Sequence, residues 1–289
     1  MFAYIDPAVK RELLIKKKLF YLDVEGRPCT SAGPRAAPFL SMVGPIALPL
    51  QVGRIERTFQ WYAWVRNSDL TRIERIVDEI RESGPQKLFS MLSSFMAVNS
   101  ALLYGDFARA KQPLVRVHSC CLTGDVFGSM RCDCGPQFQA ATRRIVRAGA
   151  GAIVYMAGHE GRGIGLWAKA ITYLLQDAGH DTYQANERLG LPADSRDFSD
   201  AARVINYFRG PGSRVRLLAN NPLKRQALEA AGIVVVEQVP VVAGISGYNA
   251  RYLQAKRRHG HLIDAEAFKH QPRQAGPRRS RLSGRARSD

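Results

Sequence analysis

The second part of the chain alternates between two hydrophobic patterns. Short, continuous apolar runs of the kind that form buried strands occupy residues 114–118, 152–155, 215–218 and 234–239. Longer stretches with apolar residues three and four positions apart, typical of helices, occupy residues 137–148, 166–178, 199–208 and 224–231. Strands that alternate with helices of this length predict an α/β fold, in which a mixed sheet is flanked by helices. We assign this pattern to one domain over residues 113–263.

The region before this domain is predicted to be an extended α+β region. Residues 1–38 show no clear period and are punctuated by glycine and proline, so we expect an irregular N-terminal extension. Residues 39–112 contain three apolar runs that predict strands, at 45–50, 58–64 and 99–105. A helix capped by Asn67 or Ser68 is expected to run to Ser83 as an insertion. These elements are either part of the core or packed on it.

The charge of the chain points to an anionic partner. The 289 residues carry a formal net charge of +17, which suits a nucleotide, a polynucleotide or an acidic surface. Residues 264–289 combine arginines with proline and glycine, so we predict a basic, disordered tail. A solubilising role for this tail is favoured, and we expect no nucleic-acid partner beyond a weak contact by it.

The sequence indicates a cytoplasmic protein. No apolar run is long enough to span a bilayer, and the N-terminal residues lack the apolar core of a signal peptide, so we expect no membrane partner. Four of the five cysteines cluster within residues 120–134, which fits a metal in a reducing compartment better than a disulfide framework.

Three of the clustered cysteines have spacing suited to a metal. Cys132 and Cys134 form a C-x-C pair, and Cys121 lies eleven residues upstream of the pair. Three thiolates and one water would make an open Zn²⁺ site of the hydrolytic type, because bound Zn²⁺ brings the pKa of a water molecule toward neutrality. The alternative is a closed structural site with Cys120 or Cys29 as the fourth ligand, and spacing alone leaves both readings open.

A glycine-rich turn provides a second candidate site. Residues 159–165 follow a predicted strand and precede a predicted helix, and they contain Gly161, Gly163 and Gly165. Such a turn lets the backbone approach a ligand, and the start of the following helix favours negative charge. Arg162 adds a guanidinium that suits phosphate oxygens. The same pattern also occurs in turns that bind nothing.

The motifs occur together in a fixed order. They occupy residues 116–119, 121–125, 131–135, 160–166, 181–182, 185–186, 189–190, 194–198, 220–224 and 260–262. This collinear set strongly resembles GTP cyclohydrolase II, the zinc enzyme that opens riboflavin biosynthesis. The resemblance covers roughly residues 113–263, which it identifies as a catalytic domain. It implies hydrolysis of GTP to 2,5-diamino-6-ribosylamino-4(3H)-pyrimidinone 5′-phosphate with release of formate and pyrophosphate, one Zn²⁺ per chain, Mg²⁺ with the nucleotide, and a homodimer.

The resemblance also implies roles for single residues. It assigns Zn²⁺ binding to Cys121, Cys132 and Cys134. It assigns contacts with the nucleotide to ten residues: Arg116, Val117, His118, Ser119, Gln137, Glu160, Gly161, Arg162, Thr182 and Lys224. It ties Tyr173 to the deformylation step, Asp194 to proton acceptance, and Arg196 to a transient adduct with the α-phosphate. Because a guanidinium is a poor nucleophile, a bidentate phosphate clamp is the simpler reading of Arg196.

Three positions depart from the family pattern. Cys120 stands where a glutamate is usual, His159 belongs to an altered turn before Glu160, and Ala219 replaces a threonine. Each change removes a polar group expected near the nucleotide, so a paralogue with another purine nucleotide substrate or a formyl-retaining product is the first alternative. The basic charge keeps open a second alternative, a nucleic-acid-binding or regulatory protein on an inactive enzyme scaffold.

Overall fold

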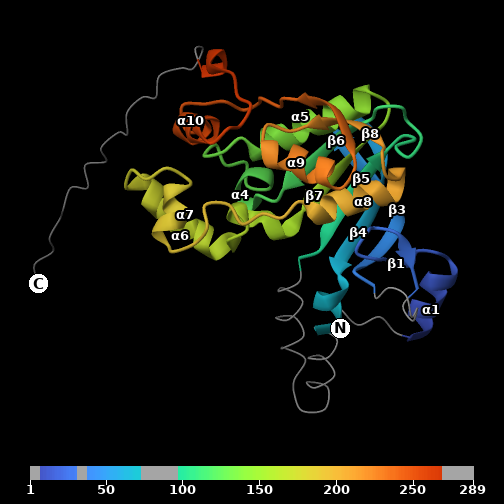
Figure 1. Cartoon of the computed structure of the whole chain (residues 1–289). Coiled ribbons are helices and arrows are strands. Elements are labelled where there is room, and N and C mark those ends of the chain that lie inside the picture. Colours follow the sequence, from blue (N-terminus) through green and yellow to red (C-terminus); the bar gives the residue numbers. More distant parts are fainter. Residues whose placement is uncertain (1–6, 31–37, 73–96, 269–289) are drawn as a thin grey trace, which may run out of the picture.

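A nine-stranded mixed sheet organises the chain. The computed structural model describes residues 7–30, 38–72 and 97–268. The strands are β1 Leu19–Leu22, β2 Pro28–Cys29, β3 Leu40–Val52, β4 Ile55–Arg66, β5 Asn99–Tyr104, β6 Leu114–Ser119, β7 Gly151–Met156, β8 Arg214–Leu218 and β9 Val234–Val239. Their order in the sheet is β2-β1-β3-β4-β5-β7-β6-β8-β9, with the N-terminal strands at one side and the predicted α/β strands at the other (Figure 1). The predicted fold class, a mixed sheet flanked by helices with extra N-terminal strands, is confirmed.

The two halves of the sheet differ in direction. Strands β1 to β5 pair antiparallel, and β5 joins β7 antiparallel as well. Strands β7, β6, β8 and β9 run parallel. Since β6 lies between β7 and β8, the chain leaves β6 to one side and returns to its other side, which makes a topological switch point. Ligands of open α/β sheets bind at the carboxyl ends of the strands at such a point.

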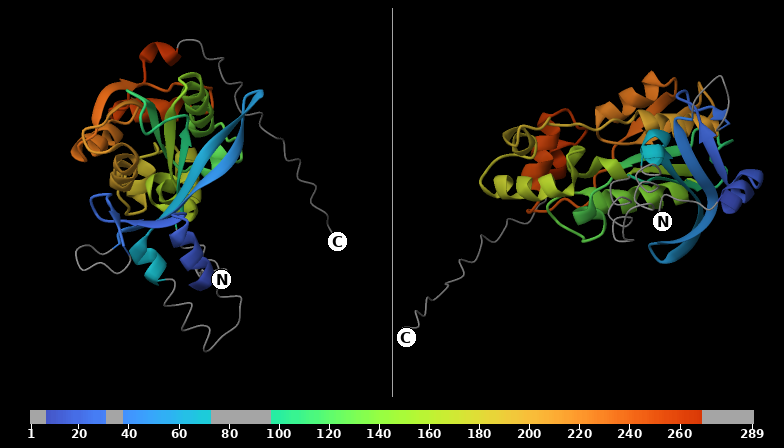
Figure 2. Two further views of the ribbon diagram at one scale, coloured as in Figure 1. Left: turned by 90° about the vertical axis from the view of Figure 1, so that its right-hand side faces the viewer. Right: turned by 90° about the horizontal axis from the view of Figure 1, so that it is seen from below.

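The helices cover both faces of the sheet and extend beyond one of its ends. They are α1 Pro7–Ile15, α4 Leu122–Asp125, α5 Cys134–Arg147, α6 Gly165–Asp177, α7 Gln184–Arg188, α8 Ser199–Arg209, α9 Pro222–Ala230 and α10 Ala250–Arg258. One core packs α8 and α9 on one face of the sheet, through residues such as Ile205 and Leu228. The other core packs α5 on the opposite face, through Ala141 and Ile145. Helices α6, α7 and α10 lie past the sheet, at the left in Figure 1 and also at the left in the right-hand view of Figure 2.

The N-terminal region is more regular than expected. The prediction of an irregular extension over residues 1–38 is wrong for residues 7–30, which form α1, β1 and β2. The four residues of β1 pair antiparallel with β3, and this pairing buries Leu19, Tyr21 and Leu22. A strand this short has too few alternating positions to produce a readable period, so its partner rather than its own sequence determines it.

The other predicted elements are found, with shifted ends. The strands expected at 45–50 and 58–64 are the middles of the hairpin β3–β4, and that at 99–105 is β5. The inserted helix begins at residue 67 as expected, but beyond residue 72 it lies outside the described residues. The disordered tail was predicted from residue 264, yet the short 3₁₀ helix Ala265–Phe268 continues the ordered chain, and residues 269–289 are outside the described part. Helices within the described ranges are all too short or too polar to cross a bilayer.

Candidate active site

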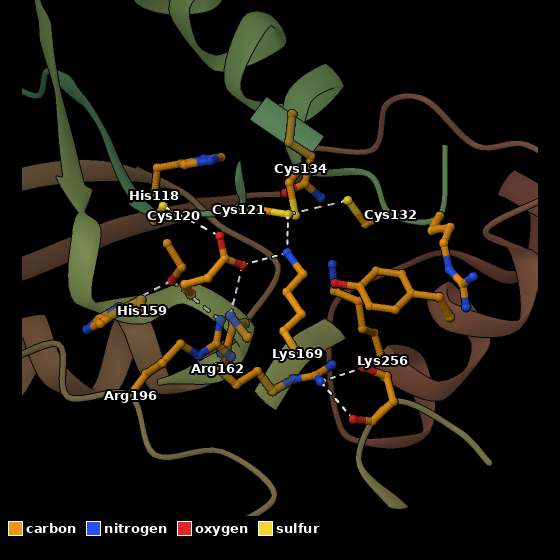
Figure 3. A pocket seen from close by; sticks show the side chains of 18 of the residues that line it. His118, Cys120, Cys121, Cys132, Cys134, His159, Arg162, Lys169, Arg196 and Lys256 are labelled. Atoms are coloured by element: carbon orange, nitrogen blue, oxygen red, sulfur yellow. Dashed lines mark hydrogen bonds and ion pairs between the residues drawn. The ribbon is translucent and has the colours of Figure 1, made fainter. Parts of the chain in front are cut away.

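A cavity opens at the carboxyl ends of the parallel strands. Its walls come from the segments that follow β6, β7 and β8, together with α6 and α10 (Figure 3). The lining residues used below are Arg116, His118, Ser119, Cys120, Cys121, Arg131, Cys132, Cys134, Gln137, His159, Glu160, Gly161, Arg162, Lys169, Tyr173, Thr182, Arg196, Asn221, Lys224, Tyr252, Lys256 and His261. The cavity therefore lies at the switch point that the strand order produces.

The three cysteines converge on one side of this cavity. Cys121 precedes α4, Cys134 begins α5, and Cys132 lies in the loop between them. All three Sγ atoms lie within 4.8 Å of one another, and those of Cys121 and Cys132 are 3.6 Å apart. Gly124 makes this approach possible, because a Cβ at that position would lie 2.7 Å from Sγ of Cys132.

The donor set fits Zn²⁺. Thiolates around a tetrahedral zinc at about 2.3 Å lie about 3.8 Å apart, close to the separation of Cys121 and Cys132. Hydrogen bonds from Cys132 and Cys134 lower the pKa of Cys121 far below its usual value, so the cluster stabilises a thiolate. Among the described residues the cluster has three members, and Cys29 lies in β2 at the opposite side of the sheet. The closed four-cysteine alternative with Cys29 is therefore wrong, and Cys120 is outside the cluster.

Glu160 links the cysteine loop to the glycine-rich turn. Its Oε2 accepts a 2.6 Å hydrogen bond from the backbone N–H of Leu122, and its Oε1 accepts one from the N–H of Gly161. Oε1 also lies 2.5 Å from Nζ of Lys169, whose ammonium is 3.2 Å from Sγ of Cys121. Both carboxylate oxygens are thus engaged by the protein itself.

His118 belongs to a buried network beneath the cysteines. Its Nε2 lies 3.1 Å from Oδ2 of Asp125, which also accepts hydrogen bonds from Tyr155 Oη and from the backbone N–H of Cys121. Burial lowers the pKa of His118 to about 4, so the imidazole is neutral at physiological pH. The neutral ring donates to Asp125, which in turn fixes the backbone of a cluster cysteine.

Arg116, Gln137 and Lys224, which are predicted to contact the nucleotide, lie on β6 or are linked to it by hydrogen bonds. The guanidinium of Arg116 donates to Oε1 of Gln137 at 2.7 Å and to the carbonyl of Leu218. Its Nε is buried without a partner, as is Nδ2 of Asn221. Lys224 Nζ donates to the carbonyl of Val117 at 2.8 Å. The side chain of Val117 is fully buried in the core and does not line the cavity, so only its carbonyl is close to the predicted contacts.

Arg162 and Arg196 line the cavity and are each held by another side chain. Arg162 donates to Oγ1 of Thr182 at 2.6 Å. Arg196 forms a two-pronged pair with Asp194, with Nε 2.8 Å from Oδ1, and its Nη1 lies 3.4 Å from Oγ of Ser119. Burial alone would lower the pKa of Arg196, but the Asp194 carboxylate outweighs burial and raises it. Arg196 lines the cavity whereas Asp194 does not, so the carboxylate holds the guanidinium from outside the cavity.

Tyr173 faces the cysteine loop from α6. Its Oη lies 3.0 Å from Oγ1 of Thr123, and the guanidinium of Arg131 sits 4.3 Å from the centre of its ring. Arg131 also donates to Asp177 and to the carbonyl of Tyr173, which ties the loop before Cys132 to α6. The phenol thus has a fixed position beside the cluster.

Sequence reasoning missed the contributions of α6 and α10. No role was expected for Lys169, and nothing pointed to Tyr252, Lys256 or His261. Lys256 donates to Oδ1 of Asp133 at 2.9 Å, between two cluster cysteines. Nδ1 of His261 is buried without a partner in the cavity wall. The sequence signal that could have revealed these residues is their spacing. Lys169 lies one helical turn from Tyr173, and Tyr252 lies one helical turn from Lys256.

The three departures from the family pattern have different surroundings. Cys120 lines the cavity, with Sγ 3.8 Å from Oε2 of Glu160. His159 lies between Ser119 and the carbonyl of Asp197, and burial lowers its pKa to about 4. Ala219 is fully buried and does not line the cavity. Cys120 and His159 therefore both alter the cavity wall, and Cys120 is the change that lies next to Glu160 and the cysteine loop.

The comparisons with known proteins identify a family. The family model of GTP cyclohydrolase II matches residues 92–240, which is more than half of the chain. The chain belongs to the GTP cyclohydrolase II family. Its catalytic domain is thus of the GTP cyclohydrolase II hydrolase type, and the expected family is confirmed. The match ends before α10, whose residues nevertheless complete the cavity.

Several curated relatives share this domain. Riboflavin biosynthesis protein RibBA of Salinispora arenicola is 46% identical over 201 residues, which cover 67% of this chain and 47% of the relative. RibBA of Nocardia farcinica is 52% identical over 163 residues, covering 56% of this chain and 39% of the relative. RibBA of Mycobacterium tuberculosis is 44% identical over 203 residues, covering 67% and 47%. The chain therefore spans less than half the length of these relatives.

Proposed function

We propose that this protein is a zinc-dependent GTP cyclohydrolase II that hydrolyses GTP to 2,5-diamino-6-ribosylamino-4(3H)-pyrimidinone 5′-phosphate, formate and pyrophosphate. This would be the first step of riboflavin biosynthesis. The observation that carries the proposal is the cysteine cluster in the wall of a cavity lined by seven Lys and Arg side chains and one carboxylate. Such an excess of positive charge suits a triphosphate, particularly with Mg²⁺ bound to it.

The cluster and the basic side chains have separate tasks in this proposal. Zn²⁺ held by Cys121, Cys132 and Cys134 would supply the Lewis acidity that activates water for attack at C8 of the purine. Arg162, Arg196 and Lys224 would bind phosphate oxygens, so that the base reaches the cysteine side of the cavity. Gln137 already orients the guanidinium of Arg116 and would present it to the nucleotide.

Tyr173 and Arg196 would have different roles in the reaction. The Tyr173 phenol, held beside Thr123, would give or take a proton during release of formate. Arg196 is best read as a bidentate clamp on the α-phosphate, because Asp194 keeps it protonated. Asp194 would then orient the guanidinium. We further propose, on the family resemblance, that the protein acts as a homodimer.

The decisive test is product analysis. The zinc-loaded protein is incubated with GTP and Mg²⁺, and products are read by mass spectrometry beside the variant Cys132→Ser. We expect the diaminopyrimidine, formate and pyrophosphate from the parent protein and none from the variant. Absence of both formate and pyrophosphate release by a zinc-loaded, folded parent protein would refute the proposal.

The surroundings of Cys120 favour one alternative. A thiol here replaces a negative charge beside the cluster, which changes what the cavity offers to the base or to a reaction intermediate. A paralogue that retains the formyl group would give a product heavier by one carbonyl unit, which the same mass spectrum resolves. Restoring the usual residue with Cys120→Glu would then shift the products toward the deformylated compound.

A further inference from the structure

Lys169 contacts the cysteine cluster from α6. Its side chain is nearly buried, and Figure 3 shows its ammonium pointing at Cys121. The distance from Nζ to Sγ is 3.2 Å. Among the hydrogen bonds of the described residues, this one alone brings a charged donor to a cluster sulfur.

The position of the ammonium is fixed by Glu160. Oε1 of Glu160 lies 2.5 Å from Nζ, and the carboxylate is itself held by the backbone N–H groups of Leu122 and Gly161. Leu122 directly follows Cys121, so the lysine, the carboxylate and the cysteine loop form one closed arrangement. A flexible lysine is thereby kept at the sulfur instead of extending into the cavity.

The net charge of the metal site explains what the contact between Lys169 and Cys121 can do. A divalent ion with three thiolates carries a formal charge of about −1, since each thiolate contributes one negative charge. Thiolates also donate electron density, which reduces the Lewis acidity on which hydrolysis depends. A hydrogen bond from an ammonium withdraws density from the sulfur that accepts it.

We propose that Lys169 is a positioning residue that tunes the metal through Cys121. Held by Glu160, its ammonium offsets the charge of one thiolate and keeps the bound metal more electrophilic than three thiolates alone would. The inference rests on the proposed zinc-dependent function but adds a residue and an electrostatic role to it. A purely structural ion pair between Lys169 and Glu160 is the competing explanation.

Cobalt spectroscopy separates the two explanations. Co²⁺ replaces zinc in the full chain, and the thiolate-to-cobalt charge-transfer band is recorded for the parent protein, Lys169→Met and Lys169→Arg. Without the ammonium the sulfur gives up electron density more easily, so the band of Lys169→Met moves to lower energy. Lys169→Arg, which keeps charge and donors, stays near the parent spectrum. Lys111→Met, which removes an exposed lysine, leaves the band unchanged.

Kinetics provide the second readout. Changes behind metal ligands typically cost about 10–100-fold in activity or metal affinity. We expect kcat of zinc-loaded Lys169→Met to fall within that range while KM for GTP changes little, and we expect Lys169→Arg to recover part of kcat. An unshifted cobalt band in Lys169→Met would overturn the proposal in favour of a structural ion pair.

A second variant and the independence of the spectrum from turnover keep the test decisive. If Lys169→Met does not fold, Lys169→Gln removes the charge but keeps a polar side chain, one atom shorter, and its band must still move to lower energy, or the inference is wrong. The cobalt spectrum does not depend on GTP turnover. A shifted band in a protein that leaves GTP intact would therefore reject the proposed function and retain the role of Lys169.

Discussion

Lys256 in α10 donates a 2.9 Å hydrogen bond to Asp133, the residue between Cys132 and Cys134. Both side chains are buried, and Asn249 at the start of α10 also donates to the carbonyl of Cys132. The C-terminal helix is thus anchored at two points to the loop that carries the C-x-C pair, more than a hundred residues earlier in the chain.

Replacing Lys256 by methionine should destabilise the protein and loosen the metal. The change leaves the carboxylate of Asp133 buried without its cation, which costs about 3–5 kcal/mol for pairs of this kind. Urea unfolding measures the loss, and zinc release to a chelator should be faster. The double variant Lys256→Met/Asp133→Asn should recover part of the stability.

An exposed ion pair supplies the control for Lys256. Arg225 and Glu229 pair on the surface of α9, with each side chain more than 40% exposed. Surface pairs contribute about 0–1 kcal/mol, so Arg225→Met should leave unfolding and zinc release almost unchanged. Equal effects of the two substitutions would contradict the anchoring role of Lys256.

Arg196 should act without becoming covalently modified. Asp194 raises its pKa despite burial, so the guanidinium keeps its proton and lacks a free electron pair for attack. Quenching the reaction with GTP labelled at the α-phosphate in alkaline denaturant, in which a phosphorus–nitrogen bond survives, should therefore give no labelled protein. Arg196→Lys keeps the charge and loses the fork, and we expect kcat/KM about 10–100-fold lower. A labelled peptide containing Arg196 would establish the adduct instead.

The sequence predicted the elements that carry their own pattern. The runs of β6 to β9 and the faces of α5, α8 and α9 are long enough to show their periods, and the glycine-rich turn falls between β7 and α6 as expected. The cysteine cluster was also predictable, because its ligands come from one short segment. Their convergence depends on Gly124, whose position leaves no room for a side chain.

The contacts that the sequence did not reveal join distant segments. Lys169 meets Cys121 across 48 positions, and Lys256 meets Asp133 across 123. Neither lysine differs from an exposed helical lysine in its local pattern, so only tertiary packing identifies it. The strand β1 was missed for a similar reason, since its four residues depend on pairing with β3.

His159 should make the protein less stable in mild acid. Burial lowers its folded pKa to about 4, whereas an unfolded histidine has a pKa of about 6.5. Above about pH 6.5 both states are neutral and nothing is gained or lost. As pH falls from there toward 4, only the unfolded chain takes up the proton, so stability is lost over that window, by about 1.4 kcal/mol at pH 5.5.

The variant His159→Gln isolates this contribution. Glutamine does not titrate, and its Nε2 amide reaches as far as the imidazole Nε2, so it can still donate to the carbonyl of Asp197, which the imidazole contacts at 2.9 Å. Urea unfolding at pH 7.5 and 5.5 should show a smaller difference in the variant than in the parent protein, by about 1.4 kcal/mol. The same pH difference in both proteins would mean that His159 takes up its proton in the folded state as readily as in the unfolded one.

Binding of a nucleotide should charge Lys224. Burial and the nearby guanidinium groups of Arg116 and Arg196 lower the pKa of Lys224 well below its usual value. A phosphate beside its Nζ would favour the ammonium and raise that pKa again, so binding takes up protons and weakens as pH rises.

Calorimetric titration with a non-hydrolysable GTP analogue, repeated in buffers of different ionisation enthalpy, counts these protons. In the pH range over which Lys224 of the free protein loses its proton, the parent protein should take up more protons than Lys224→Met, by at most about one per site. An identical count in both proteins would place the phosphates away from Lys224 and leave Arg162 and Arg196 as their binding groups.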